Sequence, residues 1–291
     1  MTAPRIAFAT SSEFPQLTDD DKLAAVALRA KGAVADPALW DTPLDWSSYD
    51  AVVIRSCWDY HHRLDEFKDW LASLEAAGVQ VFNPPSVMRW NMDKNYLSEL
   101  QDEGVAVLPS VWLPRGVKPQ LAHLLAEKGW TNAVMKPVVS AAADNTVSIT
   151  AQQAADHQAA FESLLSTGGV IVQEFAPEIQ SHGEWSFLFF NKTYSHAVLK
   201  QPRSGDFRVQ RSYGGTVSIG APAPALVEQA AAILDAVDAD LLYARVDVIE
   251  RDGRLLLMEL ELVEPHLFFE QDPGSPVRFA DALLANLVVK P

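Results

Sequence analysis

The chain of 291 residues is 48% hydrophobic, so it can bury a sizeable core, and its length predicts a globular protein of two or three lobes. Its formal net charge of −15 argues against nucleic acid or an anionic membrane as the main partner, because both would repel it. No apolar run approaches the length of a membrane span, and the first residues lack the features of a signal peptide, so we expect a cytoplasmic protein.

The first segment alternates strand and helix signals. Arg5–Thr10 reads as a strand, and a capping pattern at Thr18 opens a helix that runs to about Lys31. A strand, a helix closed by glycine and a third strand follow, over Ala51–Arg55, Leu64–Ala77 and Val79–Phe82. This alternation predicts a parallel sheet in an open α/β lobe.

The loop after the second of these strands is rich in polar and aromatic side chains. Loops at the carboxyl ends of parallel strands commonly bind ligands. We interpret this one as a substrate site in which Arg55 or Arg63 binds a carboxylate and Asp59 binds an ammonium group. The alternative is a surface loop whose aromatic residues, Trp58 and Tyr60, fold back on the core.

Cys57 is the single cysteine, which excludes an internal disulfide and any metal cluster of cysteines. Its position directly after a strand predicts a small buried residue. A reactive thiol is the less favoured alternative, because Arg55 is the one cation near it in the sequence.

Two lysines of the middle region are candidate phosphate contacts. Lys94 opens a helix that runs through Leu100, and Lys136 ends a short strand that begins at Ala133. A lysine at the end of an apolar strand, before a loop of small residues, can reach a phosphate together with the loop amides. Taken alone, either lysine would more often lie at the surface with its stem on apolar neighbours.

The remaining elements are mostly structural. Three further strands are expected over Gly169–Pro177, Gly183–Phe190 and Thr193–Lys200. Helices are expected over Ala223–Asp240 and Asp281–Val289, the first with an apolar face against the sheet.

Near the C-terminus, charges interrupt a predicted β-hairpin. Two strands, Val246–Glu250 and Leu255–Leu262, flank the turn dipeptide Asp252-Gly253. A two-residue loop there would place the carboxylates on opposite faces, whereas a three-residue loop, Arg251–Gly253, would bring all the charges to one face. We predict the three-residue loop, which gathers four side chains: Arg245, Asp247, Glu259 and Glu261.

Three carboxylates beside one guanidinium on an apolar sheet need a cation or water among them. Hard oxygen ligands of this kind suit Mg²⁺, which takes few protein carboxylates and completes its shell with water and phosphate oxygens. The alternative is that Glu259 and Glu261 line the solvated face of an amphipathic strand.

In chain order these parts resemble an ATP-grasp enzyme. The parts are a lysine before a helix, a strand ending in Lys-Pro, a strand into Gln-Glu-Phe, a Gly-Glu before another strand, and Arg-x-Asp followed by Glu-x-Glu. The resemblance implies an N-terminal open α/β, Rossmann-like lobe at 1–90, then a two-subdomain α+β fold. Its central subdomain, 91–178, would hold the phosphate loop and hinge, and its C-terminal subdomain, 179–291, the metal site.

Within that superfamily the chain is similar to a bacterial subgroup that includes the cycloserine-forming O-ureidoserine cyclo-ligase. The similar stretches are Arg55–Tyr60, Arg89–Lys94, Lys136–Ala141 and Glu259–His266. Specificity in such subgroups lies in loops, so relatives can join different acids to different amines.

The resemblance implies that MgATP binds between the two subdomains. Lys94 and Lys136 would contact its phosphates, Lys136 also acting in catalysis, and Ser140 would lie in the phosphate loop. Glu184 would bind the ribose hydroxyls. Separately from the resemblance, we expect Lys200, which opens a basic segment, to reach the γ-phosphate. The hinge strand against adenine would be Gln173, Glu174, Phe175 and Ala176.

The resemblance also assigns the charged hairpin. Asp247, Glu259 and Glu261 match magnesium ligands, and Arg245 matches the arginine that stabilises the acyl phosphate and the tetrahedral intermediate. Two features depart from the family pattern. The loop after Lys136 is Ser-Ala-Ala-Ala-Asp-Asn where glycine is usual, and Glu261 stands where relatives such as glutathione synthetase often have Asn. The site would be more acidic, with room for one carboxylate outside direct coordination.

A basic segment, Lys200–Thr216, stands out in this acidic chain. We interpret it as a binding loop in which Arg203, Arg208 and Arg211 hold an anionic substrate. The alternative is a long solvated hairpin loop whose basic residues only balance charge.

The function that these assignments imply is an ATP-dependent ligase. It would form an amide bond through an acyl phosphate on a small amino-acid-like carboxylate and release ADP and phosphate, with cyclisation of O-ureido-D-serine to D-cycloserine as one form of the reaction. Two alternatives stay open: a phosphotransferase acting on a hydroxyl, and a nucleotide-binding module without turnover. No nucleic-acid or membrane partner is expected, and a homodimer is compatible with the superfamily.

Overall fold

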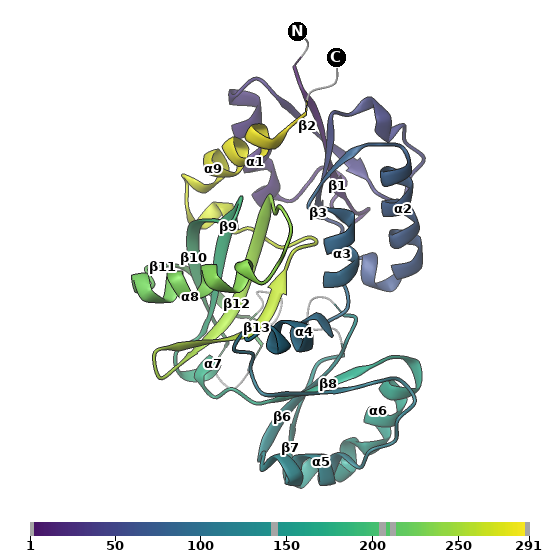
Figure 1. Cartoon of the computed structure of the whole chain (residues 1–291), viewed down its shortest axis with the longest axis vertical. Coiled ribbons are helices and arrows are strands. Elements are labelled where there is room, and N and C mark those ends of the chain that lie inside the picture. Colours follow the sequence, from purple (N-terminus) through teal and green to yellow (C-terminus); the bar gives the residue numbers. More distant parts are fainter. Residues whose placement is uncertain (1–2, 141–144, 204–207, 210–213, 289–291) are drawn as a thin grey trace.

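The structure is a computed structural model, and it describes residues 3–140, 145–203, 208–209 and 214–288. Three β-sheets follow one another along the long axis of the molecule, and both ends of the chain lie near its N-terminal sheet (Figure 1). The predicted combination of α/β and α+β parts is confirmed. Within the described ranges, none of the helices is both long and apolar enough to cross a membrane.

The N-terminal sheet is parallel, with strand order β2-β1-β3-β4. The predicted strands are present as β1 (Arg5–Thr10), β3 (Ala51–Ser56) and β4 (Gln80–Phe82), and the predicted helices as α1 (Asp19–Ala30) and α2 (Leu64–Ala76). Strand β2 (Val34–Leu39) escaped prediction because it contains Pro37. A proline is tolerated there because β2 is an edge strand, where one N–H can be lost.

The C-terminal helix returns to the N-terminal sheet. Helix α9 (Ser275–Asn286) packs beside α1 (Figure 1). The ring of Phe279 meets that of Phe8 of β1 edge-on, at 6.3 Å between centroids. The helix begins six residues before the predicted start at Asp281, and Pro276 in its first turn marks that start.

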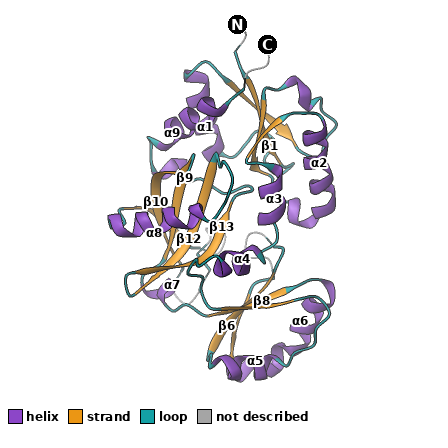
Figure 2. Ribbon diagram, in the orientation of Figure 1, coloured by secondary structure: helices purple, strands orange, loops and turns teal. Residues whose placement is uncertain are grey.

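The second sheet is antiparallel and has the order β5-β8-β6-β7. Its strands are β5 (Ser110–Leu113), β6 (Asn132–Pro137), β7 (Val147–Thr150) and β8 (Val170–Glu174). Helices α5 (Leu121–Lys128) and α6 (Ala154–Thr167) lie together on one side of it (Figure 2) and bury Leu121, Leu125 and Phe161 against its strands. The opposite face is left for the neighbouring sheet.

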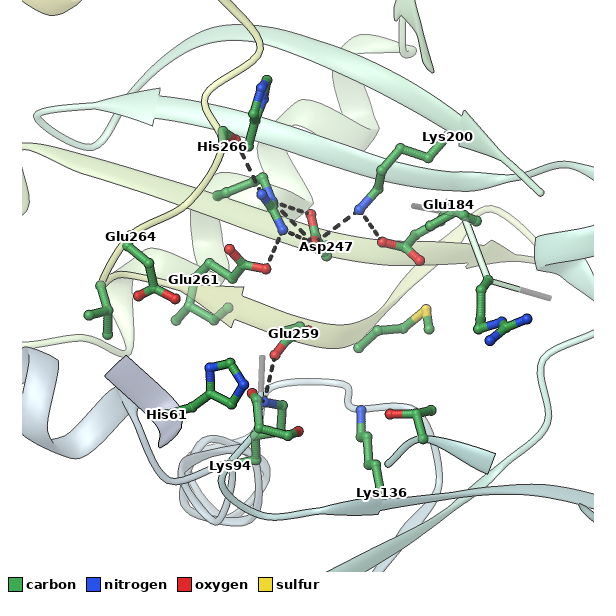
Figure 3. A pocket seen from close by; sticks show the side chains of 18 of the residues that line it. His61, Lys94, Lys136, Glu184, Lys200, Asp247, Glu259, Glu261, Glu264 and His266 are labelled. Carbon is green, nitrogen blue, oxygen red and sulfur yellow. Dashed lines mark hydrogen bonds and ion pairs between the residues drawn. The ribbon is translucent and has the colours of Figure 1, made fainter. Parts of the chain in front are cut away.

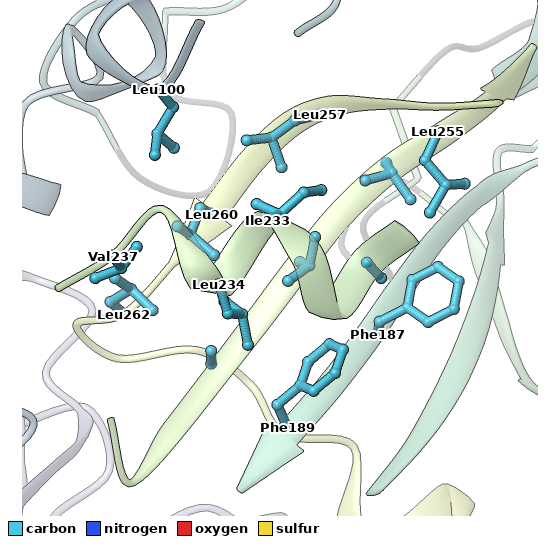
Figure 4. Packing of buried hydrophobic residues seen from close by; sticks show 14 of the residues in the cluster. Leu100, Phe187, Phe189, Ile233, Leu234, Val237, Leu255, Leu257, Leu260 and Leu262 are labelled. Atoms are coloured by element: carbon cyan, nitrogen blue, oxygen red, sulfur yellow. The ribbon is translucent and has the colours of Figure 1, made fainter. Parts of the chain in front are cut away.

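The third sheet is antiparallel, with the order β11-β10-β9-β12-β13. Its strands are β9 (Glu184–Phe190), β10 (Thr193–Gln201), β11 (Thr216–Gly220), β12 (Tyr243–Arg251) and β13 (Arg254–Glu261). Helices α4 (Tyr96–Asp102) and α8 (Pro224–Asp235) cover one face. Figure 4 shows Ile233 and Leu234 of α8 over the sheet residues Phe189, Leu255 and Leu260. The other face carries the charged side chains described below.

The register of the β12–β13 hairpin corrects the predicted three-residue loop. The loop has two residues, Asp252 and Gly253, which adopt φ of 54° and 76°, and Arg251 pairs with Arg254. The extra residue lies instead at a β-bulge, because Asp247 pairs with Glu259 while the next residue pairs with Leu257. The bulge still brings the four charged side chains to one face, as predicted, since Arg245 and Asp247 stand directly opposite Glu261 and Glu259.

The N-terminal lobe is fixed to the third sheet by buried polar contacts. The side chain of Asn83 donates to the carbonyls of Tyr243 and Leu262 at 2.9 and 2.8 Å and accepts from the Leu242 amide at 2.7 Å. The Tyr243 hydroxyl lies 2.8 Å from the carbonyl of Val263 and 3.1 Å from that of Ile54. These bonds hold the start of β12 and the loop after β13 against β3 and the residue that follows β4.

Candidate active site

A cavity of about 800 Å³ lies where the three sheets meet. Its walls come from the charged face of β12 and β13, from β6 and β8 of the second sheet, from the loop after β3, and from the loop after β13. Figure 3 shows acidic and basic side chains from these elements pointing into one space. A volume of this size accommodates a nucleotide together with a small substrate.

Asp247 is the most strongly held acid of the cavity. The Arg245 guanidinium donates to it at 2.9 and 3.1 Å, Lys200 lies 3.1 Å away, and the Ser186 hydroxyl donates at 2.5 Å. Burial alone would raise the pKa of this carboxyl, but Arg245 and Lys200 outweigh it and lower the pKa to about 2. Asp247 is therefore ionised at neutral pH.

Arg245 connects the sheet to the loop after β13. Its guanidinium pairs with Glu261 and donates to the carbonyl of His266 at 3.2 Å. Burial, together with the charges of Glu259 and Asp247, raises the pKa of Glu261 to about 7 in spite of Arg245. Neighbouring cations therefore stabilise the ionised form of Glu261 less than that of Asp247.

Glu184 and Lys200 face each other across β9 and β10 and form a buried ion pair. Burial raises the pKa of Glu184, and the nearby acids Asp247 and Glu184 raise that of Lys200 against its burial. Gly183 permits this arrangement. Its φ is 95°, and a Cβ there would lie 2.7 Å from the carbonyl oxygen of Lys200, so a larger residue would displace the strand.

Both predicted phosphate lysines line the cavity. The Lys94 ammonium is buried and lies 2.5 Å from the Ser140 carbonyl and 3.1 Å from Glu259. The Lys136 ammonium donates to the side-chain oxygen of Gln173 at 3.3 Å, and burial lowers its pKa. Neither lysine lies at the outer surface, which was the alternative for a lysine taken alone.

The predicted hinge residues also line the cavity. Gln173, Glu174, Phe175 and Ala176 contribute to its wall at the end of β8. Gln173 donates to the Ser110 hydroxyl at 2.9 Å, and Glu174 pairs with Arg251 at 3.0 Å. Their contact with adenine stays a prediction.

The end of β3 and the loop after it contribute side chains both to the cavity and to the core. Trp58, Asp59 and Tyr60 line the cavity, but Arg55 does not. Arg55 is buried beneath it, where it donates to Asp21 at 2.8 Å and to the carbonyl of Pro265 at 3.0 Å. Cys57 is fully buried and burial raises its pKa, in agreement with the expected inert thiol.

The basic segment after β10 is only partly described. Arg208 lines the cavity, whereas Arg203 is exposed and does not line it. Arg211 lies outside the described residues. Of the three arginines proposed to hold an anionic substrate, the structure therefore places Arg208 at the cavity wall.

Comparison with known proteins identifies the family. The family described as D-cycloserine synthetase DcsG, N-terminal domain, matches residues 6–83. The cycloserine biosynthesis protein DcsG of Streptomyces lavendulae is 32% identical over 282 residues, which cover 90% of this chain and 91% of that protein. The chain belongs to the DcsG family.

Solved structures agree with this assignment. The crystal structure of D-cycloserine synthetase DcsG superposes with a TM-score of 0.88 at 28% identity and covers 98% of this chain and 100% of that one. The ATP-grasp ligase PsnB, solved with Mg and ADP, gives a TM-score of 0.68 at 18% identity over 99% of this chain and 100% of that one. The expected ATP-grasp fold is confirmed for this DcsG-family chain.

The predicted metal ligands of this DcsG-family chain fit Mg²⁺ by their chemistry. Within the described ranges, no three His, Cys, Asp or Glu side chains converge as a metal-binding group. Mg²⁺ usually takes one or two protein carboxylates and fills its shell with water and phosphate oxygens. The cross-strand pair Asp247 and Glu259 supplies such ligands, and a divalent cation nearby would offset the cost of ionising Glu261.

Several residues at the site had no role predicted from the sequence. Ser186 is two residues beyond Glu184 on β9, so strand alternation could have placed it on the same face. Glu264, half-buried in the cavity wall, has a pKa raised well above its ordinary value by burial. Glu13 and Phe14 lie in the loop after β1, which carried no distinguishing pattern.

The buried position of Arg55 gives a prediction about stability. Replacing Arg55 by Met leaves Asp21 buried without its cation, which should cost about 3–5 kcal/mol of unfolding free energy. Arg89→Met is the matched control, because its pair with Glu75 is partly exposed and should be worth at most about 1 kcal/mol. Urea unfolding measures both. If Arg55→Met proves as stable as Arg89→Met but binds substrate poorly, Arg55 serves substrate binding rather than folding.

Proposed function

We propose that this protein is an ATP-dependent carbon–nitrogen ligase that activates the carboxylate of a small amino-acid-like substrate as an acyl phosphate. The observation that carries the proposal is the convergence of three lysines and an arginine on three carboxylates in one cavity: Lys94, Lys136, Lys200 and Arg245 with Asp247, Glu259 and Glu261. A site rich in both signs of charge suits the transfer of a phosphoryl group, because cations neutralise the phosphate oxygens and carboxylates hold Mg²⁺.

The nucleotide would lie between the second and third sheets. Its adenine would pack at the end of β8 against Phe175 and Ala176, and Glu184 would hydrogen-bond the ribose. Lys94 and Lys136 would contact the phosphates, with Ser140 at the start of the phosphate loop. Supporting this, the Ser140 carbonyl is held by Lys94, so the loop and the lysine are positioned together.

Asp247 and Glu259 would hold Mg²⁺, with Glu261 beside them. Bound there, Mg²⁺ would neutralise phosphate oxygens and orient the terminal phosphate. Lys200, already paired with Asp247 at 3.1 Å, would turn to the γ-phosphate. Arg245 would donate to the acyl oxygens, where negative charge develops during both chemical steps.

The chemistry has two steps. An oxygen of the substrate carboxylate attacks the γ-phosphorus, the bond to the bridging oxygen breaks, and ADP leaves with that electron pair. A nitrogen lone pair then attacks the acyl carbon, the carbon–oxygen bond to phosphate breaks, and the nitrogen gives up a proton as the amide forms. Trp58, Tyr60 and Arg208 would close the substrate end against water, which would otherwise hydrolyse the acyl phosphate.

The relation to a cycloserine biosynthesis protein leads us to propose that both reacting groups come from one molecule. In O-ureido-D-serine the nitrogen bonded to the side-chain oxygen would attack the activated carboxyl group and close a five-membered ring. Hydrolysis of the carbamoyl group on that nitrogen, with loss of carbon dioxide and ammonia, would then give the cycloserine ring. A site of about 800 Å³ then needs to hold a single small substrate beside the nucleotide, and no second amine.

Product analysis with purified protein tests this function. The protein is incubated with MgATP and a panel of amino acids and amines that includes O-ureido-D-serine, and ADP and inorganic phosphate are measured separately. We expect equal amounts of both with one substrate alone. ADP without free phosphate would indicate a phosphotransferase, and no ADP with any member of the panel would contradict a ligase of small amino acids.

A further inference from the structure

Glu264 differs from the other acids that line the cavity. Among the residues that the structure describes, its carboxylate has neither an ion pair nor a hydrogen bond. Glu13, which is also unpaired, is exposed and solvated. Each remaining acid of the wall has a cation of the chain beside it: Asp59 has Arg63, Glu174 has Arg251, Glu184 has Lys200, Asp247 and Glu261 have Arg245, and Glu259 has Lys94.

The segment that carries Glu264 is held among aromatic side chains. Its carbonyl accepts a hydrogen bond from the Trp58 indole at 3.0 Å, which holds the residue against the loop after β3. The Trp58 ring meets Phe14 edge-on at 5.1 Å and stacks on His266 at 6.3 Å between centroids. A half-buried carboxylate in such a wall carries a desolvation cost that a bound cation would offset.

Glu264 lies at the substrate end of the cavity. In Figure 3 it stands beyond Glu261, on the side away from Lys136 and Glu184. Arg245 reaches the same end, because it donates to the carbonyl of His266, two residues from Glu264. An amino acid carries its ammonium and carboxylate on neighbouring atoms, so a carboxylate and a guanidinium at the same end of the cavity match both groups.

We propose that Glu264 binds the ammonium group of the substrate and thereby makes the site specific for amino acids with a free α-amine. This assignment rests on the ligase function proposed above. It replaces Asp59 in that role, because the Asp59 oxygens are bound by Arg63 at 2.6 Å and by the Trp40 indole at 3.0 Å. Asp59 instead fixes the loop that carries Trp58.

The proposed contact would also keep the α-amine from acting as the nucleophile. An ammonium group has no lone pair, so an amine held protonated by Glu264 cannot attack the activated carboxyl group. The nucleophile must then be another nitrogen, either in the substrate side chain or in a second molecule. Glu264 would therefore direct amide formation away from the α-amine as well as orient the carboxylate toward Arg245 and the phosphate lysines.

Calorimetry tests the proposal. It measures the binding of O-ureido-D-serine, and of the same compound without its α-amine, to protein that holds Mg²⁺ and a non-hydrolysable ATP analogue. The proteins are the wild type, Glu264→Gln, which keeps the side-chain shape, and Glu250→Gln as the matched control, because Glu250 is also half-buried but does not line the cavity. For O-ureido-D-serine we expect Kd to rise about 10- to 100-fold in Glu264→Gln, the usual range for a charged hydrogen bond, and to stay unchanged in Glu250→Gln. The wild type should bind the analogue without the α-amine about as weakly as Glu264→Gln binds O-ureido-D-serine. The comparison of the two compounds on the wild type does not depend on whether a variant folds.

The outcomes separate this proposal from the proposed function. If the wild type turns over O-ureido-D-serine and Glu264→Gln binds it equally well, or if the wild type binds both compounds alike, Glu264 is not the ammonium ligand although the ligase function stands. If the wild type prefers the amine-bearing compound in binding but releases no phosphate from it, the function fails and the ammonium site survives. A wild type that binds neither compound overturns both.

Discussion

Replacing Glu259 by Gln is expected to lower the rate of phosphate release by about 10²–10³-fold, because charge stabilisation by a bound metal is worth several kcal/mol and each 1.4 kcal/mol is about tenfold. Glu259 stands directly across from Asp247 and faces the cavity near both phosphate lysines. Lys94 and Lys136 keep its pKa low against the effect of burial. Glutamine preserves the shape of this ligand but removes its charge.

The Glu259→Gln substitution should lower turnover much more than nucleotide binding. Lys94 keeps its contact with the Ser140 carbonyl in the variant, and the adenine wall is untouched, so we expect nucleotide binding to persist when it is measured by calorimetry with ADP. Glu250→Gln is the control on the same hairpin, because that residue is half-buried near the turn and does not line the cavity. Unchanged phosphate release in Glu259→Gln would instead support the solvated-strand alternative for these acids.

The N-terminal lobe was largely predictable because its signals are local. The capping pattern at Thr18 is realised, since its hydroxyl accepts a hydrogen bond from the Asp21 amide at 3.1 Å. The apolar strands and the glycine that closes α2 also lie where the sequence indicates. Strand β2 shows the limit, because it is an edge strand that depends on its pairing with β1 rather than on its own residues.

The charged face of β12 and β13 was predicted for partly the wrong reason. The sequence indicates strands and a turn dipeptide, but it does not reveal where an unpaired residue is accommodated. Both an odd loop and a bulge put Asp247 on the same face as Glu259. The structure uses the bulge, which places the two residues directly opposite each other. The requirement that the charges share a face therefore predicted the site better than the loop length did.

Contacts between distant segments account for what sequence reasoning could not place. Arg55 lies at the carboxyl end of a parallel strand, a position that favours a substrate role, yet its guanidinium forms an ion pair with Asp21 of α1 at 2.8 Å. Glu264 was overlooked for the opposite reason. Its importance depends on the absence of a partner among the described residues, and that can be recognised only when the surrounding loops are in place.

Replacing Lys136 by Met is expected to separate activity from stability. The Lys136 ammonium is half-buried and lies near the equally cationic Lys94, and its contact within the described residues is the Gln173 side chain at 3.3 Å. Because we propose that Lys136 contacts the transferred phosphate, removing its charge should lower kcat/KM for ATP by about 10²–10³-fold, as for other electrostatic groups in active sites. Removing a charge that burial disfavours should leave the Tm unchanged or raise it.

The pH dependence of stability distinguishes this explanation from a loss of packing. The folded-state pKa of Lys136 is below the ordinary value of 10.5, so its charged form destabilises the folded protein at neutral pH, and that cost disappears as the pH rises toward 10.5. Any stability advantage of Lys136→Met should therefore be largest at neutral pH and shrink in alkali. Lys128→Met, at an exposed lysine of α5, should change neither activity nor Tm. A Lys136→Met protein that loses stability at every pH, or that keeps its turnover, would contradict the interpretation that Lys136 destabilises the fold and serves to contact phosphate.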